Sequence, residues 1–549
     1  MPPTPDPLAA LRAAIELAAD ELDGDAGARL TLERPPKPEL GDYSTNAAML
    51  LAPVVGLAPR EVAERLRELL AGELGTSAER IEVAGPGFLN VFLSDRWHRE
   101  ATAGLLTAGE RLGAGHPEPP ERALVEFVSA NPTGPVTAAG GRGAAFGDSL
   151  ARLLELRGHE VEREYYLNDA GTQIRLFAES IAARMRGDEP PPDGYNGEYV
   201  AELATELSAA GGGPDDLDDL GRRGTEAMRE RIEVSLERFR VSFDTWSSER
   251  RLQESGALTR TIGDLRERGH VYESEGAVWL RTTEFGDDKD RVLIRSDGEP
   301  TYFATDLAYH RDKLEREAER LITPMGADHH GYVPRMRAGL AALGHDPDSY
   351  EAPIMQLVNI VDGGQRSRMS KRKGEFVALD ELVDDIGVDA ARFFMVQRSH
   401  DTAFDLDLEL ARSQSQDNPV YYVQYAHARI ASILRKAAEE GAAGGRPAEE
   451  AALDDEALDA AAEPAERALV RRLLELPGEV ATAADRRAPH RLCAYGMATA
   501  ADFHAFYRDC RVVGAAPATE AARLGLCVAA RRTIATTLGL LGVTAPARM

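Results

Sequence analysis

The chain has 549 residues, of which 43% are hydrophobic, and this length favours several soluble domains because a single core rarely grows beyond roughly 250 to 300 residues. The formal net charge of -28 argues, taken alone, against a nucleic-acid binder, since phosphate contacts are made by clustered Lys and Arg. The three cysteines, Cys493, Cys510 and Cys527, are far apart, which argues against a zinc site or a redox pair.

The first residues lack the basic start and the continuous apolar core of a signal peptide. No later stretch approaches the roughly 18 apolar residues that a membrane span needs. We therefore expect a cytoplasmic protein that makes no membrane contact.

Residues 1–115 are predicted to form an α+β domain. The segment "APREVAERLRELLAGEL" has the apolar spacing of a surface helix, and "IEVAGPGFLNVFLS" indicates two strands joined at Gly85 to Gly87. A Pro- and Gly-rich linker then indicates a domain boundary near residue 115.

Residues 116–415 alternate strand-like and helix-like segments, which predicts an α/β Rossmann-like domain with a parallel sheet and crossover helices. An acidic, Pro- and Gly-punctuated stretch at about 187–290 is interpreted as an insertion in this domain. Residues 276–300 predict a β-hairpin that turns at Gly286 to Asp288. Beyond about residue 415 the strand signals vanish, so residues 416–549 are predicted to form an all-α helical bundle.

Residues 125–148, "VEFVSANPTGPVTAAGGRGAAFGD", predict a buried strand, a tight turn and the start of a helix. Such a turn presents unpaired backbone N–H groups and the positive end of a helix dipole, which suits a phosphate. Gly134, Gly140, Gly141 and Gly143 allow the backbone to come close to a ligand. From this stretch alone, a turn made only for packing is an equally good interpretation.

The loop "DGGQRSRMSKRKGEF" gathers basic residues at Arg366, Arg368, Lys371, Arg372 and Lys373. The whole chain has only 6 Lys beside 58 Arg, so two lysines in one loop favour a function over a solvated charge run. A flexible cationic loop suits the charge that develops on a transferring phosphoryl or nucleotidyl group.

In "PTYFATDLAYHRDKL", Tyr302 and Asp306 have the four-residue spacing that puts them on one helical face. A carboxylate beside an aromatic ring suits a guanidinium, although an ordinary helix start with an exposed Asp306 is the better interpretation of this segment alone. "PMGADHHGYVPR" adds Asp328, His329 and His330, which suit a nucleotide better than a metal because no carboxylate or cysteine cluster is nearby.

Taken together, these stretches resemble the arginyl-tRNA synthetases, which are class I aminoacyl-tRNA synthetases, over nearly the whole chain. "ELGDYSTNAAMLLA" and "GPGFLNVFLS" are similar to that family's N-terminal domain. Its catalytic domain is resembled by "FVSANPTGP", "YYLNDAGTQ", "FDTWSSER", "YFATDLAYH", "GADHHGYVPR" and "MSKRKG", and its anticodon-binding domain by "YYVQYAHARIASIL" and "LGLLGVTAPARM". A cysteine-activating relative would usually carry zinc ligands, which the scattered cysteines do not provide.

The resemblance implies that arginine and ATP give arginyl-adenylate and pyrophosphate, in a step that generally needs bound tRNA, and that the arginyl group then passes to the 3′ end of tRNA(Arg). Mg2+ would accompany ATP, and no protein-bound metal is expected. Lys371 would stabilise the leaving pyrophosphate, with Arg368 in place of the first lysine of the family's loop. The residues implied to hold arginine are Glu126, Asn131, Tyr302 and Asp306. Those implied to hold ATP are Pro132, Thr133, Gly134, Gly140, Gly141, Asp328, His329, Met369, Ser370 and Lys371.

The sequence departs from the family at residues 137–140, where Thr-Ala-Ala-Gly replaces the usual His-Val/Ile-Gly-His. Removing one preorganised donor to a charged transition state typically slows a reaction about 10²- to 10³-fold. One hypothesis is that the Thr137 hydroxyl, the helix-start amides near Gly140 to Arg142 and the basic loop replace the two histidines. The alternative is a tRNA-binding paralogue with impaired adenylation. Because the guanidinium pocket, the lysine loop and all three domains remain, the sequence favours an active ligase.

Contacts with tRNA(Arg) are expected from both flanking domains of what we expect to be a monomer. The residues concerned are Asp42, Tyr43 and Asn46 in the first domain, and Tyr422, Gln424, Tyr425 and Arg429 in the last. Stacking on unpaired bases is the mechanism that the tyrosine rings would allow, although core packing is at least as good an interpretation of Tyr422 and Tyr425. A locally positive face formed by arginines is expected despite the acidic total.

Overall fold

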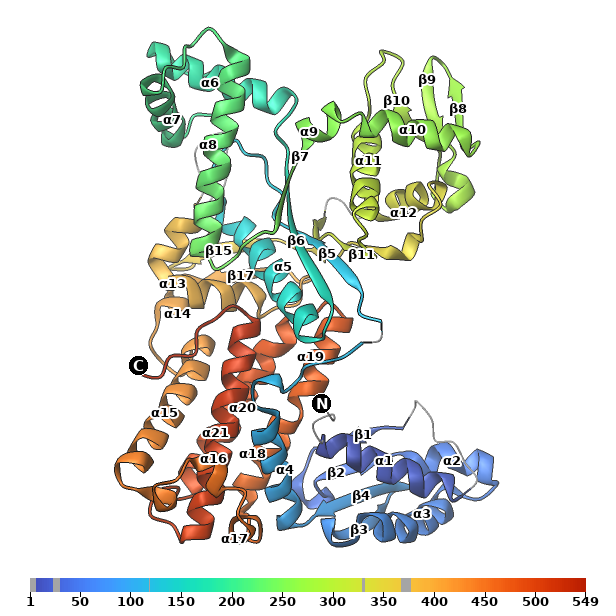
Figure 1. The fold of residues 1–549 in the computed structure, drawn as a ribbon, viewed down its shortest axis with the longest axis vertical. Helices are drawn as coiled ribbons and strands as arrows, with labels where there is room; N and C mark the ends of the chain where they lie inside the picture. The colour runs from blue at the N-terminus through green and yellow to red at the C-terminus, as the bar shows by residue number, and fades with distance from the viewer. Residues whose placement is uncertain (1–5, 23–29, 118, 328–330, 367–376) are drawn as a thin grey trace.

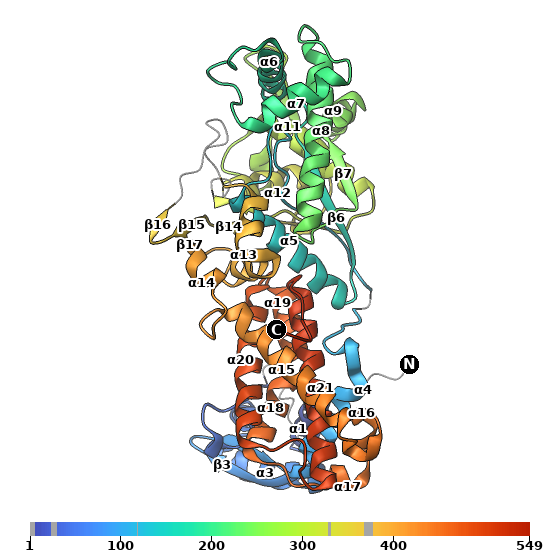
Figure 2. The same ribbon diagram turned by 90° about the vertical axis from the view of Figure 1, so that its left-hand side faces the viewer.

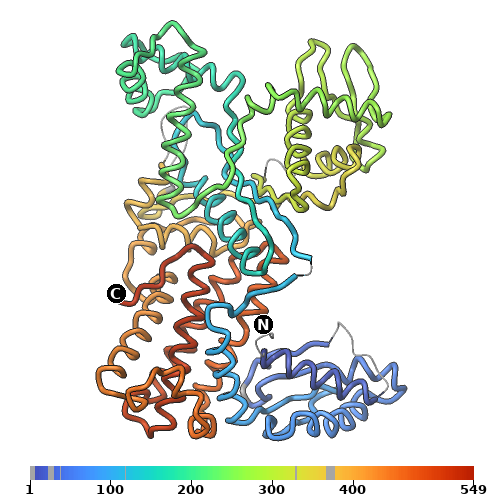
Figure 3. The backbone as a smooth tube through the Cα atoms, viewed as in Figure 1, coloured from blue at the N-terminus to red at the C-terminus, as the bar shows by residue number. Residues whose placement is uncertain are grey.

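The structure is a computed structural model that describes residues 6–22, 30–117, 119–327, 331–366 and 377–549. The N-terminal domain and the helical domain lie side by side at one end of the molecule, and the predicted catalytic domain with two outer lobes occupies the other (Figures 1 and 3). The predicted combination of an α+β domain, a parallel-sheet domain and a helical bundle is confirmed.

The N-terminal domain is a four-stranded antiparallel sheet, in the order β1-β2-β4-β3, covered by three helices. Its elements are α1 (Pro7–Asp20), β1 (Leu32–Glu33), β2 (Tyr43–Thr45), α2 (Ala47–Val55), α3 (Pro59–Leu74), β3 (Ala78–Ala84) and β4 (Phe88–Leu93). The predicted surface helix is α3, and β3 and β4 form the predicted pair of strands. A Cβ atom on Gly87 would lie 3.0 Å from the Pro59 carbonyl oxygen, so this turn needs a residue without a side chain.

The helix α4 (Asp95–Ala108) follows this sheet directly in the chain but packs on the helical domain. Its buried face lies against α18 (Pro464–Leu474) and α21 (Pro517–Leu540). By packing, the first domain therefore ends at about residue 94, earlier than the linker near residue 115 predicts.

The catalytic domain is built on a five-stranded parallel sheet in the order β13-β11-β5-β6-β7. The strands are β5 (Arg122–Glu126), β6 (Glu160–Leu167), β7 (Thr245–Ser248), β11 (Arg320–Ile322) and β13 (Tyr350–Glu351). The helix α5 (Ala138–Leu156) is the crossover between β5 and β6. Its inner face is almost wholly buried, because small residues let it lie close to the sheet.

The predicted insertion at about 187–290 is not one unit, because β7 lies within it and belongs to the central sheet. The first lobe, before β7, consists of α6 (Thr172–Arg186), α7 (Glu198–Ala209) and α8 (Leu217–Arg238) around a hydrophobic cluster of their own. The second lobe contains α9 (Glu249–Glu254), α10 (Ala257–Glu267), β8 (Val271–Ser274), β9 (Ala277–Leu280), β10 (Arg291–Ile294), α11 (Tyr302–Glu315) and α12 (Tyr332–Ala342). The antiparallel pair β9 and β10 confirms the predicted hairpin, and the two lobes stand apart in Figure 1.

Two smaller sheets complete the catalytic domain. Their strands are β12 (Met325–Gly326), β14 (Ile354–Met355), β15 (Val358–Asp362), β16 (Gln365–Arg366) and β17 (Phe404–Asp407). The helices α13 (Leu379–Val396) and α14 (Leu408–Arg412) follow β16 and β17.

The helical domain runs along the long axis of the molecule, as Figure 2 shows. Its helices are α15 (Pro419–Glu439), α16 (Ala448–Ala451), α17 (Asp455–Leu458), α18, α19 (Leu476–Asp485), α20 (His490–Asp509) and α21. The Ala/Glu-rich connection between α15 and α18 forms two short helices that rest on α21.

A buried arginine joins this domain to α5. The guanidinium of Arg392 is fully buried and donates to the carboxylate of Asp148 on α5 at 2.5 Å and to the Leu541 carbonyl oxygen at 2.9 Å. A Cβ atom on Gly542 would lie 2.3 Å from that guanidinium, so the chain after α21 passes unusually close to it. The helix α5 is thus fixed to the end of the helical domain.

Candidate active site

The turn that follows β5 is held in a strained conformation. Val128 and Ser129 both have positive φ, 68° and 41°, which is costly for residues with side chains and is found where the surroundings enforce it. The Ser129 hydroxyl donates to Glu126 Oε1 at 2.9 Å, and the Tyr165 hydroxyl on β6 contacts both the N–H and the carbonyl of Ala130. These contacts hold the turn in place at the carboxyl edge of the sheet. This is the edge where α/β proteins bind ligands.

The centre of the turn is packed against the first lobe. The Tyr199 hydroxyl donates to the Thr133 carbonyl oxygen at 2.8 Å, and a Cβ atom on Gly134 would lie 2.9 Å from that hydroxyl. Pro132, Thr133 and Gly134 are all buried. The packing interpretation is thus correct for Gly134, and contact between these three residues and ATP remains a prediction.

The first turn of α5 uses most of its own amide groups. Thr137 is the N-cap, and its hydroxyl oxygen accepts from the Gly140 N–H at 3.0 Å. The Gly141 N–H donates to the Thr137 carbonyl, and the Ala138 N–H donates to the Val377 carbonyl at 2.8 Å. Within the described residues, only the Ala139 N–H of these first amides shows no acceptor. The hypothesis that amides near Gly140 to Arg142 can bind phosphates is therefore corrected at two positions. The N–H groups of Gly140 and Gly141 already donate to Thr137.

Arg142 is also committed to the protein. Its guanidinium is 3% exposed and donates to the carbonyl oxygens of Gln356, Ser399 and Thr402. Burial lowers the pKa of Arg142 to about 10, so it stays charged at neutral pH while it fixes α5 to the segments that precede β15 and β17.

We expect Thr137→Ala to loosen the start of α5, because an N-cap hydroxyl typically contributes about 1 kcal/mol to its helix. Hydrogen exchange at the Gly140 amide should become faster in this variant, as measured by mass spectrometry. Thr137→Ser keeps the hydroxyl and should exchange like the unaltered protein. Equal exchange in all three proteins would show that the cap does not hold the turn.

The residues of the predicted lysine loop, including Arg368, Met369, Ser370 and Lys371, lie outside the described residues, as do Asp328 and His329. Both ends of the loop are described. It leaves from β16, which pairs with β15, and it returns beside the turn, where the Leu379 N–H donates to the Val136 carbonyl at 2.8 Å and Thr137 bridges Ala378. A ten-residue segment that carries Lys371 thus ends next to the start of α5.

Glu126, predicted to bind a guanidinium, lies at the end of β5 and is already partnered. Its Oε2 accepts from the ammonium of Lys313 at 2.5 Å, and Lys313 is fully buried on α11. Its Oε1 accepts from Ser129. Both carboxylate oxygens of Glu126 are therefore already engaged by side chains of the protein.

Asp306 is half-buried on α11, one turn after Tyr302, as the spacing predicts. It accepts a hydrogen bond from the Tyr332 hydroxyl on α12. Burial and then the charge of Asp306 raise the pKa of Tyr332 well above its usual value, so Tyr332 keeps its proton and donates it. Tyr302 is 81% exposed, so its predicted contact with the guanidinium remains a prediction.

Two further carboxylates that sequence analysis missed, Glu249 and Asp169, act electrostatically on the same tyrosine as Asp306 and Glu126. Burial raises the pKa of Tyr166 above its usual range, and the charges of Glu249, Asp306, Glu126 and Asp169 raise it further, in that order. Asp169 accepts from the Ser248 hydroxyl at 2.6 Å and from the Arg250 N–H at 2.9 Å. Both missed acids lie in stretches that were singled out, "YYLNDAGTQ" and "FDTWSSER", where the acidic residue after each strand is the signal.

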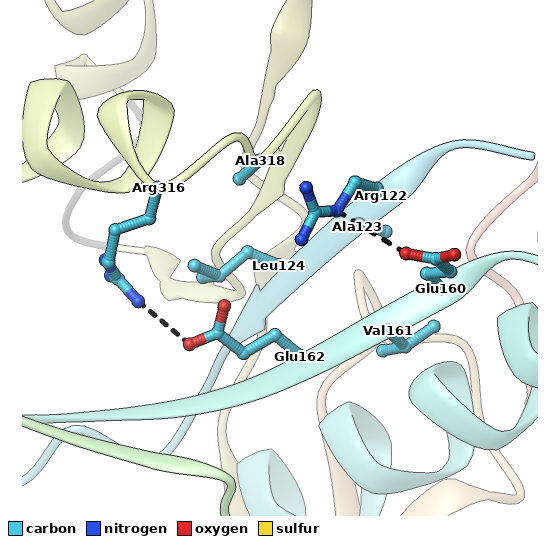
Figure 4. A pocket seen from close by; sticks show the side chains of 8 residues that line it. All are labelled: Arg122, Ala123, Leu124, Glu160, Val161, Glu162, Arg316 and Ala318. Atoms are coloured by element: carbon cyan, nitrogen blue, oxygen red, sulfur yellow. Dashed lines mark hydrogen bonds and ion pairs between the residues drawn. The ribbon is translucent and has the colours of Figure 1, made fainter.

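A separate cavity of about 170 Å³ lies at the opposite, amino edge of β5 and β6 (Figure 4). Two ion pairs cross it, Arg122 with Glu160 at 3.4 Å and Arg316 with Glu162 at 2.8 Å. Its charges are paired with one another, so the carboxyl edge remains the better candidate for substrate binding.

Comparison with known proteins decides the family. Three family models match in chain order: the arginyl tRNA synthetase N terminal domain at residues 9–93, the class I (R) tRNA synthetase catalytic domain at 213–419 and the DALR anticodon binding domain at 423–549. Arginine–tRNA ligase of Frankia alni is 48% identical over 547 residues, covering 97% of each chain. The chain belongs to the arginyl-tRNA synthetase family. The enzyme of the same name from Desulforamulus reducens is 44% identical, covering 94% of this chain and 93% of its own. The Thermus thermophilus arginyl-tRNA synthetase structure is 26% identical with a TM-score of 0.76, covering 98% of this chain and all of that one.

The departure at residues 137–140 stands out within an arginyl-tRNA synthetase. The match to the catalytic-domain model begins at residue 213, after this turn. A Cβ atom on Gly140 would lie 3.3 Å from the Thr137 hydroxyl oxygen, so the two positions are close neighbours at the helix start. Thr137 keeps a capping hydroxyl where the family usually has its first histidine.

The structure does not support direct tRNA contact by Asp42 and Tyr43. Asp42 is 4% exposed and Tyr43 is 2% exposed, because both lie between the N-terminal domain and the helical domain. Asn46 caps α2 from a half-buried position and accepts from the Thr31 N–H at 2.9 Å. A surface ligand cannot reach the first two side chains unless these domains separate.

Residues predicted to contact tRNA in the helical domain divide into two groups. Gln424 is 8% exposed and donates to Asp389 and to the Thr544 carbonyl, which is a structural role. Tyr422 packs on His504 and on the core, as the packing interpretation expects. Tyr425 and Arg429 instead line an open cavity of about 440 Å³, where the Arg429 guanidinium lies 4.8 Å from the Tyr425 ring centroid. Arg435, Lys436 and Arg548 line the same cavity, which makes it locally basic.

Among the described residues no cluster of His, Cys, Asp and Glu is arranged to hold a metal ion. None of the described helices has the length and apolar character of a membrane span. The three cysteines are free and buried, and the pKa of Cys493 lies above its usual range through burial.

Proposed function

We propose that this chain is an arginine–tRNA ligase that activates arginine with ATP and transfers the arginyl group to the 3′ end of tRNA(Arg). The observation that carries the proposal is the match to arginine–tRNA ligases along nearly the whole chain, at 43 to 48% identity. The carboxylates near the carboxyl edge of the central sheet, among them Asp306 and Glu249, support arginine as the amino acid.

In the proposed pocket, Asp306 and Glu249 receive the guanidinium, and the Glu126–Lys313 ion pair forms the floor. Guanidinium groups pair well with carboxylates because their planar donors match two oxygens at once. Asn131 lies half-buried on the turn above, and the proposal assigns it the α-amino group. ATP then lies over the start of α5, with its phosphates toward Lys371 and Arg368, and Mg2+ accompanies it as part of the substrate.

Because the two usual histidines are absent, few groups remain that can stabilise the charge of the transition state. The helix dipole of α5 and the Ala139 N–H face the phosphates, and the lysine loop supplies the mobile positive charge. The impaired paralogue remains the competing proposal, and its only support is the Thr-Ala-Ala-Gly segment at 137–140.

Aminoacylation of total tRNA with labelled arginine tests the function directly. The expected result is charging that requires ATP and arginine, together with ATP–pyrophosphate exchange that requires tRNA. Tight tRNA binding without charging would instead favour the paralogue. We also propose a monomer in the cytoplasm, which sedimentation at working concentration and cell fractionation test.

Arginine binding should become tighter as pH rises. Burial and then the charges of Asp306 and Asp169 raise the pKa of Glu249 to about 7, so this carboxyl is largely protonated at pH 6 and ionised at pH 8. The ionised form attracts a guanidinium, so the KM for arginine should fall between pH 6 and pH 8. Glu249→Gln should remove this dependence while the KM for ATP stays unchanged.

The same group predicts the direction of a stability change. Because the folded-state pKa lies above the unfolded one, the stability that Glu249 contributes is present below pH 4.5 and is lost as pH rises through about 7. Glu249→Gln should therefore stabilise the protein more at pH 8 than at pH 5. An equal shift in melting temperature at both pH values would contradict the raised pKa.

A further inference from the structure

A buried ion pair joins the N-terminal domain to the helical domain. Asp42, in the turn before β2, accepts from the guanidinium of Arg471 on α18, and both residues are almost fully buried. The other oxygen of Asp42 accepts from the Leu93 N–H at 2.7 Å. One carboxylate thus fixes the end of β4 within its own domain and reaches across to the other domain.

The backbone around Asp42 leaves it little freedom. Gly41 has a φ of 97°, and a Cβ atom there would lie 2.8 Å from the Val91 carbonyl oxygen. The Asp42 N–H donates to that same carbonyl at 2.9 Å. The backbone of the turn therefore lies directly against β4.

His98 lies beside this pair but does not neutralise Asp42. Its Nε2 is 3.6 Å from the Asp42 carboxylate, and burial lowers the pKa of His98 to about 4. His98 is therefore neutral at working pH. The other charged groups that act on the histidine are Arg467, Asp95 and Arg99. The cation paired with the Asp42 carboxylate is Arg471.

Weaker ion pairs surround the buried one across the same boundary. Arg34 of the N-terminal domain lies 3.6 Å from Glu475 and 3.8 Å from Asp502, and Glu79 on β3 lies 3.6 Å from Arg467. These side chains are about a quarter to a half exposed, so solvent screens them. A buried pair with a partly exposed rim fixes orientation, because an unpaired charge in its place would be strongly unfavourable.

We propose that the Asp42–Arg471 ion pair is a positioning device for tRNA, which holds the N-terminal domain at one orientation on the helical domain so that both can bind a single tRNA. Asp42 itself does not touch the nucleic acid. The proposal rests on the proposed ligase function. Two binding surfaces joined in fixed geometry bind far more tightly than either does alone, and this gain is lost when the geometry is wrong.

The test compares Asp42→Asn with Arg471→Met in steady-state aminoacylation. Asparagine keeps the shape of the side chain and an oxygen for the Leu93 N–H, but it removes the charge. Each variant should raise the KM for tRNA by about tenfold, with the KM values for arginine and ATP and the kcat at saturating tRNA within about twofold of the unaltered protein. The double variant should show less than the product of the two effects, because both changes break one interaction.

Glu64→Gln is the matched control, since Glu64 is exposed on α3 and pairs with Arg67 within the same helix. Its KM for tRNA should not change. If either buried-pair variant fails to fold, Arg34→Gln at the rim replaces it, with a smaller rise of the same sign expected. Small-angle scattering without tRNA should show a larger radius of gyration for Asp42→Asn.

Two results would overturn the proposal. An unchanged KM for tRNA in both variants would show that the pair positions nothing. A raised KM in Asp42→Asn but not in Arg471→Met would indicate that Asp42 contacts tRNA directly. Failure of the unaltered protein to charge any tRNA would refute the ligase function itself, which is a different outcome.

Discussion

Lys371→Ala is expected to slow tRNA-dependent ATP–pyrophosphate exchange by about 10²- to 10³-fold, the usual effect of removing one group that stabilises transition-state charge. The effect should be at the high end here, because no histidine at residues 137–140 shares the task. The loop that carries Lys371 returns to the chain at Ala378, which is bridged to Thr137. The described end of the loop at Ala378 therefore lies beside the start of α5.

Lys373→Ala is the control for this prediction, because it removes the same charge from the same loop two residues away. A much smaller loss of exchange is expected from it. Equal losses in both variants would show that the overall charge of the loop matters and that Lys371 has no special place. Normal exchange in Lys371→Ala would contradict the leaving-group role altogether.

Asp306→Asn is expected to raise the KM for arginine by roughly 30- to 150-fold, which corresponds to about 2 to 3 kcal/mol for a hydrogen bond to a charged group. The amide of asparagine still provides an oxygen for the Tyr332 hydroxyl, so α11 and α12 should stay together. The KM for ATP should change little, because the proposed function assigns Asp306 to the guanidinium and not to the nucleotide.

Glu315→Gln, on the exposed end of the same helix, provides the comparison. Glu315 pairs with Arg311 at 2.8 Å and is about half exposed, so its loss should leave every kinetic constant near that of the unaltered protein. An Asp306→Asn enzyme with an unchanged KM for arginine would place the guanidinium elsewhere. Charging of tRNA with citrulline, a neutral analogue of arginine, should be poor in both the Asp306→Asn and the Glu315→Gln variants.

Much of this fold is readable from local patterns. The turn after β5, the β9–β10 hairpin and the loss of strands after residue 415 each depend on neighbouring residues, and the structure has all three. The strand β7 was missed because it has four half-buried residues within an acidic stretch, with too few apolar positions to show a period.

The site was predicted less completely, because its chemistry depends on distant contacts. Thr137 and Asp306 were identified from motifs. No motif shows that Lys313 forms an ion pair with Glu126, or that the charge of Asp306 acts on Glu249. Asp42 was predicted to contact tRNA, but its side chain is almost fully buried in an ion pair. Its partner, Arg471, is 429 residues away in the chain, and only the packed domains bring the two together.

The position of α4 determines how this protein can be divided for experiments. Leu105 and Leu106 of α4 are buried, and Leu106 lies against Gly525 and Arg532 of α21. A recombinant piece that starts at residue 416 would expose to water the apolar surface of α18 and α21 that α4 covers, and this favours aggregation. Joining residues 94–112 to it through a flexible linker, or producing them as a second polypeptide, would cover this surface again.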